Sequence, residues 1–287
     1  MKTVGYYNGT IGEIEDMMVP MNDRAMYFGD GVYDATYAAK RNIFEMEWHL
    51  DRFYNSARLL EMPFTMPREE LTAEIQKCVD LMDSDGEVMV YWQITRGTGM
   101  RNHAFPEDGK PANLLITIRE MPLTDLRKPY RVITLEDTRF LHCNIKTLNL
   151  IPSVMANQRA KEAGCQEAVF HRGERVTECA HSNVHILKDG VFRTAPTDHL
   201  ILPGITRKHL LKICEQAGIP YKEEAFRVED LFTADEIIIS SAGTLAVPVC
   251  EVDGKLVGGK APELLHKLQE TAVADFERET GYKLDIL

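Results

Sequence analysis

The stretch from Thr138 to Leu150 reads TRFLHCNIKTLNL, and its single lysine, Lys146, is the residue around which we interpret the chain. The apolar residues that flank its polar centre are Phe140, Leu141, Ile145, Leu148 and Leu150. We expect these residues to be buried anchors for the lysine, and burial favours the neutral amine, which can attack an aldehyde and form a Schiff base. A lysine beside apolar residues more often extends its ammonium into water. Taken alone, the stretch therefore favours a structural role over a catalytic one.

Length and composition are those of an ordinary globular protein. The 287 residues are enough for two moderate domains or one large domain, and the apolar fraction of 44% and charged fraction of 27% are typical of soluble proteins. The net charge of -11 repels phosphodiester backbones, so we expect no nucleic-acid partner. We see no apolar targeting segment at the start and no run near the roughly 20 apolar residues that cross a bilayer. A cytoplasmic protein without a membrane partner is expected.

The cysteines and histidines do not predict a metal site. Six cysteines are scattered without a CxxC pair, which argues against a disulfide framework and against zinc. His181 and His185 lie four residues apart, but their β-branched surroundings predict a strand and the glutamate of the zinc-protease motif is missing. The segment RGTGMR at 96–101 lacks the third glycine of a dinucleotide-binding loop. We therefore expect no metal and no Rossmann fingerprint.

The first part of the chain predicts an α+β domain over residues 1–120. Period-two patterns predict strands at 3–8, 87–95 and 113–120 and a hairpin of 32–40 with 43–46. Helical spacing of apolar residues predicts a helix from Trp48 that is ended by Pro63, and a second helix that begins at Pro67 and stops at residues 83–86. The segment MNDRAMYFGDG at 21–31 predicts a tight loop, and the proline-containing segment 121–129 predicts a linker.

Residues 130–287 predict a second, larger domain. The expected strands are 131–135, 167–171, 183–188, 191–194 and 236–244, and the expected helices are 152–163, 205–218 and about 262–279. The motif PGIT places Gly204 and Thr206 at a helix start, where free N–H groups and the helix dipole favour a bound phosphate. The small residues SSAGT at 240–244 offer a second place where backbone amides can approach an anion.

Seven motifs occur in order over nearly the whole chain. They are FGDGVYD at 28–34, HLDRF at 49–53, TRGTGMRNHAFP at 95–106, CNIKTLNL at 143–150, VTECAHSN at 176–183, LPGIT at 202–206 and SSAGT at 240–244. Together they resemble the fold-type IV pyridoxal-phosphate aminotransferases, and within these the bacterial D-amino-acid aminotransferases. The resemblance implies an α/β (α+β) fold of two domains, a smaller N-terminal one and a larger barrel-like one, with pyridoxal 5'-phosphate in the cleft.

The resemblance also implies residue roles. Lys146 would form the Schiff base with pyridoxal phosphate and then carry the proton between the substrate α-carbon and the cofactor. Arg52, Ile205 and Thr206 would hold the phosphate, and Glu178 would pair with the pyridine nitrogen. The complete set of expected cofactor-binding residues is Arg52, Lys146, Glu178, Ser182, Asn183, Leu202, Gly204, Ile205, Thr206, Ala242 and Gly243.

Three residues distinguish the subfamily. By resemblance, Tyr33 and the RxH pair of Arg101 and His103 trap the substrate α-carboxylate, with the loop supplied across a homodimer interface. This implies transamination between a D-amino acid such as D-alanine or D-glutamate and a 2-oxo acid such as 2-oxoglutarate or pyruvate. The alternatives that remain are a branched-chain L-aminotransferase, an aminodeoxychorismate lyase, and a non-catalytic carrier of pyridoxal phosphate or another phosphate ligand.

This chain also departs from its relatives in places. Cys179, Ala180 and His181 stand where small hydroxyl residues follow the glutamate, and Ala242 replaces a threonine that commonly touches the phosphate. The resemblance therefore leaves the polar surroundings of the cofactor partly undefined.

Overall fold

A computed structural model describes residues 1–106 and 109–287 of the chain, which divide into two units. Unit 1 comprises Met1–Pro122, Ile145–Asn149 and Arg278–Tyr282. Unit 2 comprises Leu123–Asn144, Leu150–Glu277 and Lys283–Leu287. Each unit contains both helices and strands, which confirms the expected mixed α/β fold class.

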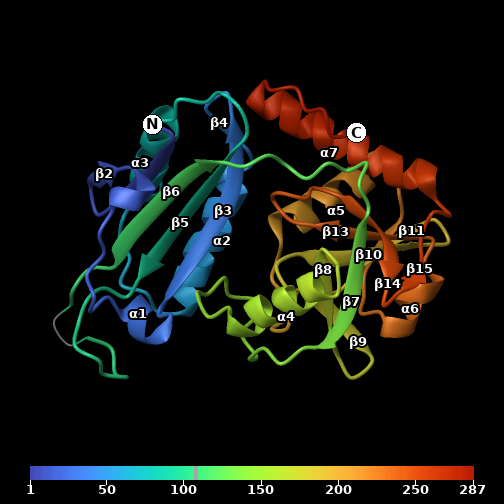
Figure 1. The fold of residues 1–287 in the computed structure, drawn as a ribbon, viewed down its shortest axis with the longest axis horizontal. Helices are drawn as coiled ribbons and strands as arrows, with labels where there is room; N and C mark the ends of the chain where they lie inside the picture. Colours follow the sequence, from blue (N-terminus) through green and yellow to red (C-terminus); the bar gives the residue numbers. More distant parts are fainter. Residues whose placement is uncertain (107–108) are drawn as a thin grey trace. The chain divides into compact units, whose positions relative to one another are not determined.

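Unit 1 is built on an antiparallel sheet of six strands in the order β2-β1-β6-β5-β3-β4 (Figure 1). The strands are β1 (Thr3–Tyr7), β2 (Thr10–Gly12), β3 (Gly31–Ala39), β4 (Asn42–Ile43), β5 (Val88–Thr95) and β6 (Asn113–Glu120). The helices are the 3-10 helix η1 (Ile14–Asp16), α1 (Arg24–Phe28), α2 (Met46–Leu59) and α3 (Arg68–Asp80). The expected strands, hairpin and two long helices of this region are confirmed.

Alternation along the strands decides which side chains enter the core of unit 1. In β5, Val90, Trp92 and Ile94 are fully buried and pack in one cluster with Phe53 of α2 and Ile75 of α3. Successive side chains of a strand point to opposite faces. The residues that alternate with these three along β5 therefore face away from the helices.

The segment 21–31 is not a simple loop, because it contains the five-residue helix α1. The Asp23 side chain accepts a hydrogen bond from the backbone N of Ala25 at 2.8 Å and caps the start of the helix. Gly29 ends it in the left-handed conformation, at φ 61°. A helix this short shows no apolar period, which is why the sequence predicted only a loop.

The Lys146 segment belongs to unit 1, although it follows the 121–129 segment in sequence. It runs antiparallel to the start of β3: Val32 is bridged to Thr147, and Leu148 N donates to Gly31 O at 3.1 Å. Ile145 is buried in the core of unit 1.

The expected burial of the flanking residues is wrong for three of them. Phe140, Leu141 and Leu150 are 43%, 54% and 39% exposed. Pairing with β3 and the burial of Ile145 hold the lysine segment instead. Apolar composition alone could not show this, because single apolar side chains are common on protein surfaces.

Unit 2 contains a sheet of nine strands, with the path β12-β11-β10-β13-β14-β7-β8-β9 and β15 paired to β14. The strands are β7 (Tyr130–Glu136), β8 (Glu167–Arg172), β9 (Arg175–Cys179), β10 (Asn183–Lys188), β11 (Val191–Thr194), β12 (Tyr221–Glu223), β13 (Glu236–Ser240), β14 (Val247–Val252) and β15 (Lys255–Leu256). The helices are α4 (Ile151–Glu162), α5 (Ile205–Ala217), α6 (Val228–Thr233) and α7 (Pro262–Thr280), which ends in unit 1. The sheet curls into a half-barrel, as expected for the larger domain (Figure 1).

Apolar faces of two helices close the main core of unit 2. Leu210 and Ile213 of α5 and Leu268 of α7 pack with Leu187 and Phe192 of the sheet. The sequence correctly predicted these helices but missed β9 and β14 and extended the strand β13 into a turn at 241–244. Within residues 1–106 and 109–287, no helix is both long and apolar enough to span a membrane.

Candidate active site

In unit 1, Lys146 is fixed by its backbone and by an aromatic ring. Its carbonyl oxygen accepts a hydrogen bond from Tyr33 N at 3.0 Å, and its own N donates to Ser56 Oγ at 3.2 Å. The Nζ atom lies 4.3 Å from the centroid of the Tyr33 ring, a cation–π contact. Tyr33 stacks in turn on Tyr91, with ring centroids 5.4 Å apart. The structure thus places Lys146 and Tyr33, both singled out from the sequence, against each other.

Arg52 lies on α2 and is held by a buried carboxylate. Its Nε and Nη2 donate to Asp34 Oδ2 and Oδ1 at 2.9 and 2.7 Å, and His49 Nδ1 lies 2.7 Å from Asp34 Oδ1. Burial on its own raises the pKa of Asp34, but Arg52 and His49 hold that pKa well below its usual range. Burial lowers the pKa of His49. Asp34 is therefore ionised and fixes the plane of the Arg52 guanidinium.

Sequence reasoning missed Asp34 and His49, although a signal for each exists. Asp34 lies on the same face of β3 as the buried Val32 and Ala38, where an aspartate needs a partner. His49 precedes Arg52 by three positions, so the two share one face of α2.

In unit 2, both oxygens of Glu178 are bound by donors. Arg139 Nη1 donates to Oε1, while Oε2 accepts from Asn183 Nδ2 at 3.0 Å and from Leu202 N at 3.1 Å. Glu178 is only 5% exposed. A buried carboxylate with a cation and two N–H donors is stabilised in its charged form. The structure therefore brings Glu178, Asn183 and Leu202, all expected site residues, into one network.

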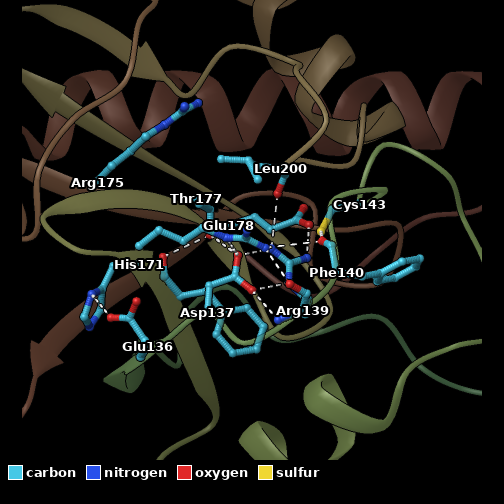
Figure 2. A network of polar contacts seen from close by, with 12 residues as sticks. Glu136, Asp137, Arg139, Phe140, Cys143, His171, Arg175, Thr177, Glu178 and Leu200 are labelled. Carbon is cyan, nitrogen blue, oxygen red and sulfur yellow. Dashed lines mark hydrogen bonds and ion pairs between the residues drawn. The ribbon is translucent and has the colours of Figure 1, made fainter.

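Arg139 extends this network to a second carboxylate, as Figure 2 shows. Its Nη2 donates to Asp137 Oδ2 at 2.8 Å and to the carbonyl oxygen of Leu200 at 3.2 Å, and its guanidinium lies 4.8 Å from the Phe170 ring centroid. Burial alone would lower the pKa of Arg139, but Asp137 and Glu178 raise it above its ordinary value. Sequence reasoning missed Arg139, although it lies in the stretch quoted first.

The residues expected at a phosphate lie at the start of α5 and after β13. Gly204 is the N-cap of α5 and has no side chain to accept a hydrogen bond from the first N–H groups of the helix, which include those of Ile205 and Thr206. A Cβ on Gly204 would lie 1.9 Å from Asn183 Oδ1, so any larger residue there would displace the Asn183 side chain. Such a helix start presents N–H donors and a positive dipole end to an anion.

Ala242 and Gly243 lie in the turn that follows β13. Within this turn, Leu245 N donates to Ser241 O at 3.0 Å, and Gly243 O accepts from Thr124 N at 2.9 Å. One hydrogen bond within the turn and one from Thr124 therefore fix its backbone.

Ser182 binds the carboxylate of Glu167 rather than that of Glu178. Its Oγ donates to Glu167 Oε2 at 2.6 Å, and Glu167 also contacts His181 Nδ1. Glu167 is fully buried, whereas the His181 side chain is 61% exposed. Burial raises the pKa of the neighbouring Cys179 thiol well above its usual value. The structure therefore groups Ser182 with Glu167 and His181.

Arg101 and His103 lie together on the loop that follows β5 in unit 1, and both are exposed. The Arg101 guanidinium lies 5.4 Å from the centroid of the Phe28 ring, and the His103 ring lies 5.2 Å from the same ring. Their spacing of two residues places both side chains on one aromatic platform.

The other side chains do not form a metal centre. Within residues 1–106 and 109–287, no group of three or more His, Cys, Asp or Glu side chains is arranged to hold an ion. The His185 imidazole is buried between two hydroxyls, with Thr194 Oγ1 and Ser240 Oγ each 2.8 Å from a ring nitrogen.

Comparison with known proteins gives consistent results. Residues 31–252 match the family described as Amino-transferase class IV. The D-alanine aminotransferase of Listeria monocytogenes (serotype 4b, strain F2365) is 38% identical over 279 residues, which cover 96% of each chain. Two solved structures share the fold. The branched-chain aminotransferase of Thermoproteus uzoniensis, with norvaline, has a TM-score of 0.86, is 22% identical and covers 97% of this chain and 96% of its own. The branched-chain amino acid aminotransferase of Escherichia coli has a TM-score of 0.84, is 23% identical and covers 99% and 97%.

Proposed function

The chain belongs to the class IV aminotransferases, and from this we propose that it transfers the amino group of a D-amino acid to a 2-oxo acid. D-Alanine or D-glutamate would be the donor, and 2-oxoglutarate or pyruvate the acceptor. The observation that carries the choice of substrate is the 38% identity to a D-alanine aminotransferase over 96% of both chains. The RxH pair of Arg101 and His103 supports it, because two N–H donor groups on one ring are suited to orient a carboxylate.

We propose pyridoxal 5'-phosphate as the cofactor, because the donor set fits its chemistry. The chain offers an amine held on an aromatic ring, a buried carboxylate with bound donors, and a helix start without a side-chain cap at a glycine packed against Asn183. When bound, pyridoxal phosphate supplies an electron sink for the pair of electrons released at the substrate α-carbon. The residues that would hold it are Arg52, Lys146, Glu178, Ser182, Asn183, Leu202, Gly204, Ile205, Thr206, Ala242 and Gly243.

Individual residues would have distinct tasks. Lys146 would hold the cofactor covalently through Nζ and, once released, move the proton at the α-carbon. Glu178, kept charged by Arg139, would keep the pyridine nitrogen protonated. Arg52, with its guanidinium plane fixed by Asp34, would contribute a positive charge for the phosphate.

We further propose that the enzyme is a homodimer in which the Arg101 loop serves the partner's substrate. Ile151, Val154 and Met155 of α4 support the dimer, because they are 70%, 61% and 52% exposed at helical spacing on one face. A second copy of the chain would cover these side chains. A cytoplasmic location remains the prediction made from the sequence.

A substrate panel tests the function. The purified protein, supplied with pyridoxal phosphate, is assayed with matched D- and L-amino acids, including leucine, against 2-oxoglutarate and pyruvate. We expect turnover of D-alanine and D-glutamate and weak turnover of L-leucine. Preference for L-leucine would replace the proposal with a branched-chain L-aminotransferase. Release of pyruvate from aminodeoxychorismate would indicate a lyase. Borohydride trapping of the cofactor on Lys146 without any turnover would indicate a carrier.

A further inference from the structure

The loop that carries Arg101 and His103 rests on a buried charge cluster. Asp30 accepts hydrogen bonds from Arg24 Nε at 2.8 Å and from Arg96 Nε at 3.0 Å. The side chains of Arg24 and Arg96 are 5% and 4% exposed, whereas the two loop residues are open to solvent. Buried cations need fixed acceptors, so the base of the loop has a defined geometry.

Arg24 also binds the loop directly. Its Nη1 donates at 2.7 Å to the carbonyl oxygen of Asn102, the residue between Arg101 and His103. Its backbone N donates to Gly97 O at 3.0 Å. One arginine therefore holds the loop at its start and between the two side chains that point outward.

Phe28 connects the same arginine to both loop side chains. Its ring centroid lies 4.9 Å from the Arg24 guanidinium, 5.4 Å from that of Arg101 and 5.2 Å from the His103 ring. Arginine stacks readily on aromatic faces, and a stacked guanidinium loses less freedom when it binds an anion. The ring thus pre-orders both groups.

We propose that Arg24 and Phe28 are positioning residues for the substrate carboxylate, acting through Arg101 and His103. This inference rests on the proposed function, because it assigns a task to the loop only if the loop binds that carboxylate. Neither residue would touch the substrate. Each would lower the conformational cost of fixing the two binding groups when the substrate binds.

Three variants test the inference in the enzyme loaded with pyridoxal phosphate. Arg24→Met removes the bonds to Asp30 and Asn102, Arg24→Lys keeps the charge but not the fork of donors, and Phe28→Leu removes the ring while keeping apolar volume. Arg68→Met is the matched control, since Arg68 also lies over an aromatic ring, 6.0 Å from the Tyr54 centroid, but far along the chain from the loop. The readouts are KM and kcat for D-alanine, and the affinity for pyridoxal phosphate measured by its visible absorption.

We expect Arg24→Met to raise KM by about tenfold or more, the loss expected for one charge-assisted hydrogen bond. Phe28→Leu should raise KM less, Arg24→Lys should recover part of the loss, and the control should match the wild type. Cofactor affinity should stay within about twofold of the wild type, a difference well below one hydrogen bond. Arg24→Met should raise KM by a smaller factor in the Arg101→Ala background than in the wild type, because only His103 then remains to be positioned.

Opposite results overturn the inference in identifiable ways. Unchanged KM in Arg24→Met and Phe28→Leu, or additive effects in the double variant, would show that the two residues do not act through Arg101. A rise in KM that is accompanied by equally large falls in kcat and in cofactor affinity would show a general structural role. If Arg24→Met does not fold, Phe28→Leu and Arg24→Lys decide the question. If the wild type transaminates no amino acid, the proposed function itself is wrong. If the wild type transaminates but the variants leave KM unchanged, only this inference is wrong.

Discussion

The Arg139 guanidinium contacts the Glu178 carboxylate, and both side chains are buried in unit 2. The same guanidinium binds Asp137, so a single cation is shared between two acids. Asp137 is itself ionised, because hydrogen bonding and charge from Arg139 outweigh burial and hold its pKa below the usual value. The carboxylate of Glu178 is therefore paired with a residue 39 positions earlier in the chain.

Arg139→Met should impair catalysis more than cofactor binding. Without the cation, Glu178 is more easily protonated, so kcat should fall by about tenfold or more, the effect of one lost charge-assisted bond. The activity should also decline at a higher pH than in the wild type when the pH is lowered. Steady-state kinetics from about pH 5.5 to about pH 9 would measure both effects. Arg172→Met is the control, because Arg172 binds Asp137 and the Arg139 carbonyl but not Glu178. Equal pH profiles in the two variants would contradict the role of Arg139.

Lys146→Ala should abolish both covalent attachment of the cofactor and turnover. The variant lacks the only amine that we propose for these steps, so kcat should fall by about a hundredfold or more. Mass spectrometry after borohydride reduction with pyridoxal phosphate would show labelled wild type and unlabelled variant. Lys128→Ala serves as the control, since Lys128 is exposed and pairs with Asp125. Label retained on Lys146→Ala would assign the attachment to another lysine.

Asp34→Asn should destabilise unit 1 and weaken cofactor binding. Arg52 would lose a charged partner inside the protein, which costs about 3 kcal/mol or more in the free energy of unfolding. The guanidinium would also lose its fixed orientation, so the affinity for pyridoxal phosphate should fall. Urea denaturation and a cofactor titration would measure the two effects. Asp51→Asn tests an exposed ion pair between α2, the helix that carries Arg52, and Arg68 at the start of α3, and should cost about 1 kcal/mol or less. Similar costs for both variants would exclude a special role for Asp34.

His185 should make the fold sensitive to mild acid. Burial, with a smaller effect of Arg207, lowers its pKa to about 3 in the folded protein. The unfolded chain takes up this proton at about pH 6.5. The unfolded state therefore binds more protons between these values, and stability is lost as the pH falls below about 6.5, by about 1.4 kcal/mol per pH unit. Urea midpoints at about pH 7, 6 and 5 would fall less steeply in His185→Gln than in the wild type. Parallel pH dependence would show that other groups cause the acid sensitivity.

The sequence correctly predicted the strands and helices that have a regular spacing of apolar residues. Alternating apolar residues identified β5 and β6, and helical spacing identified α2, α3, α5 and α7. The pattern failed for β14, since Pro248 interrupts it. It also failed for α1, which is too short to show a period.

A candidate site residue could be predicted from the sequence where a motif contains it. A residue that only pairs with such a candidate, from a distant position in the chain, could not. Motifs single out Lys146, Arg52 and Glu178 as candidates, whereas their neighbours Asp34 and Arg139 were missed. Asp34 meets Arg52 across 18 positions, and Arg139 meets Glu178 across 39. Spacing in a single sequence does not show which charges come together after folding, so a buried charge in a predicted strand or apolar stretch indicates only that a partner exists.

The pairing of residues 145–149 with β3 has a consequence for protein synthesis. While the ribosome is still translating residues before Asn149, the first half of β3 has a free backbone edge on that side, because Val32 and Tyr33 pair there with Thr147 and Lys146. Free strand edges are sites of mispairing. The Asn42 side chain also donates to the carbonyl oxygen of Thr280, a residue that is translated 238 positions later. The contacts that complete this part of unit 1 can therefore form only after residues far along the chain have been translated.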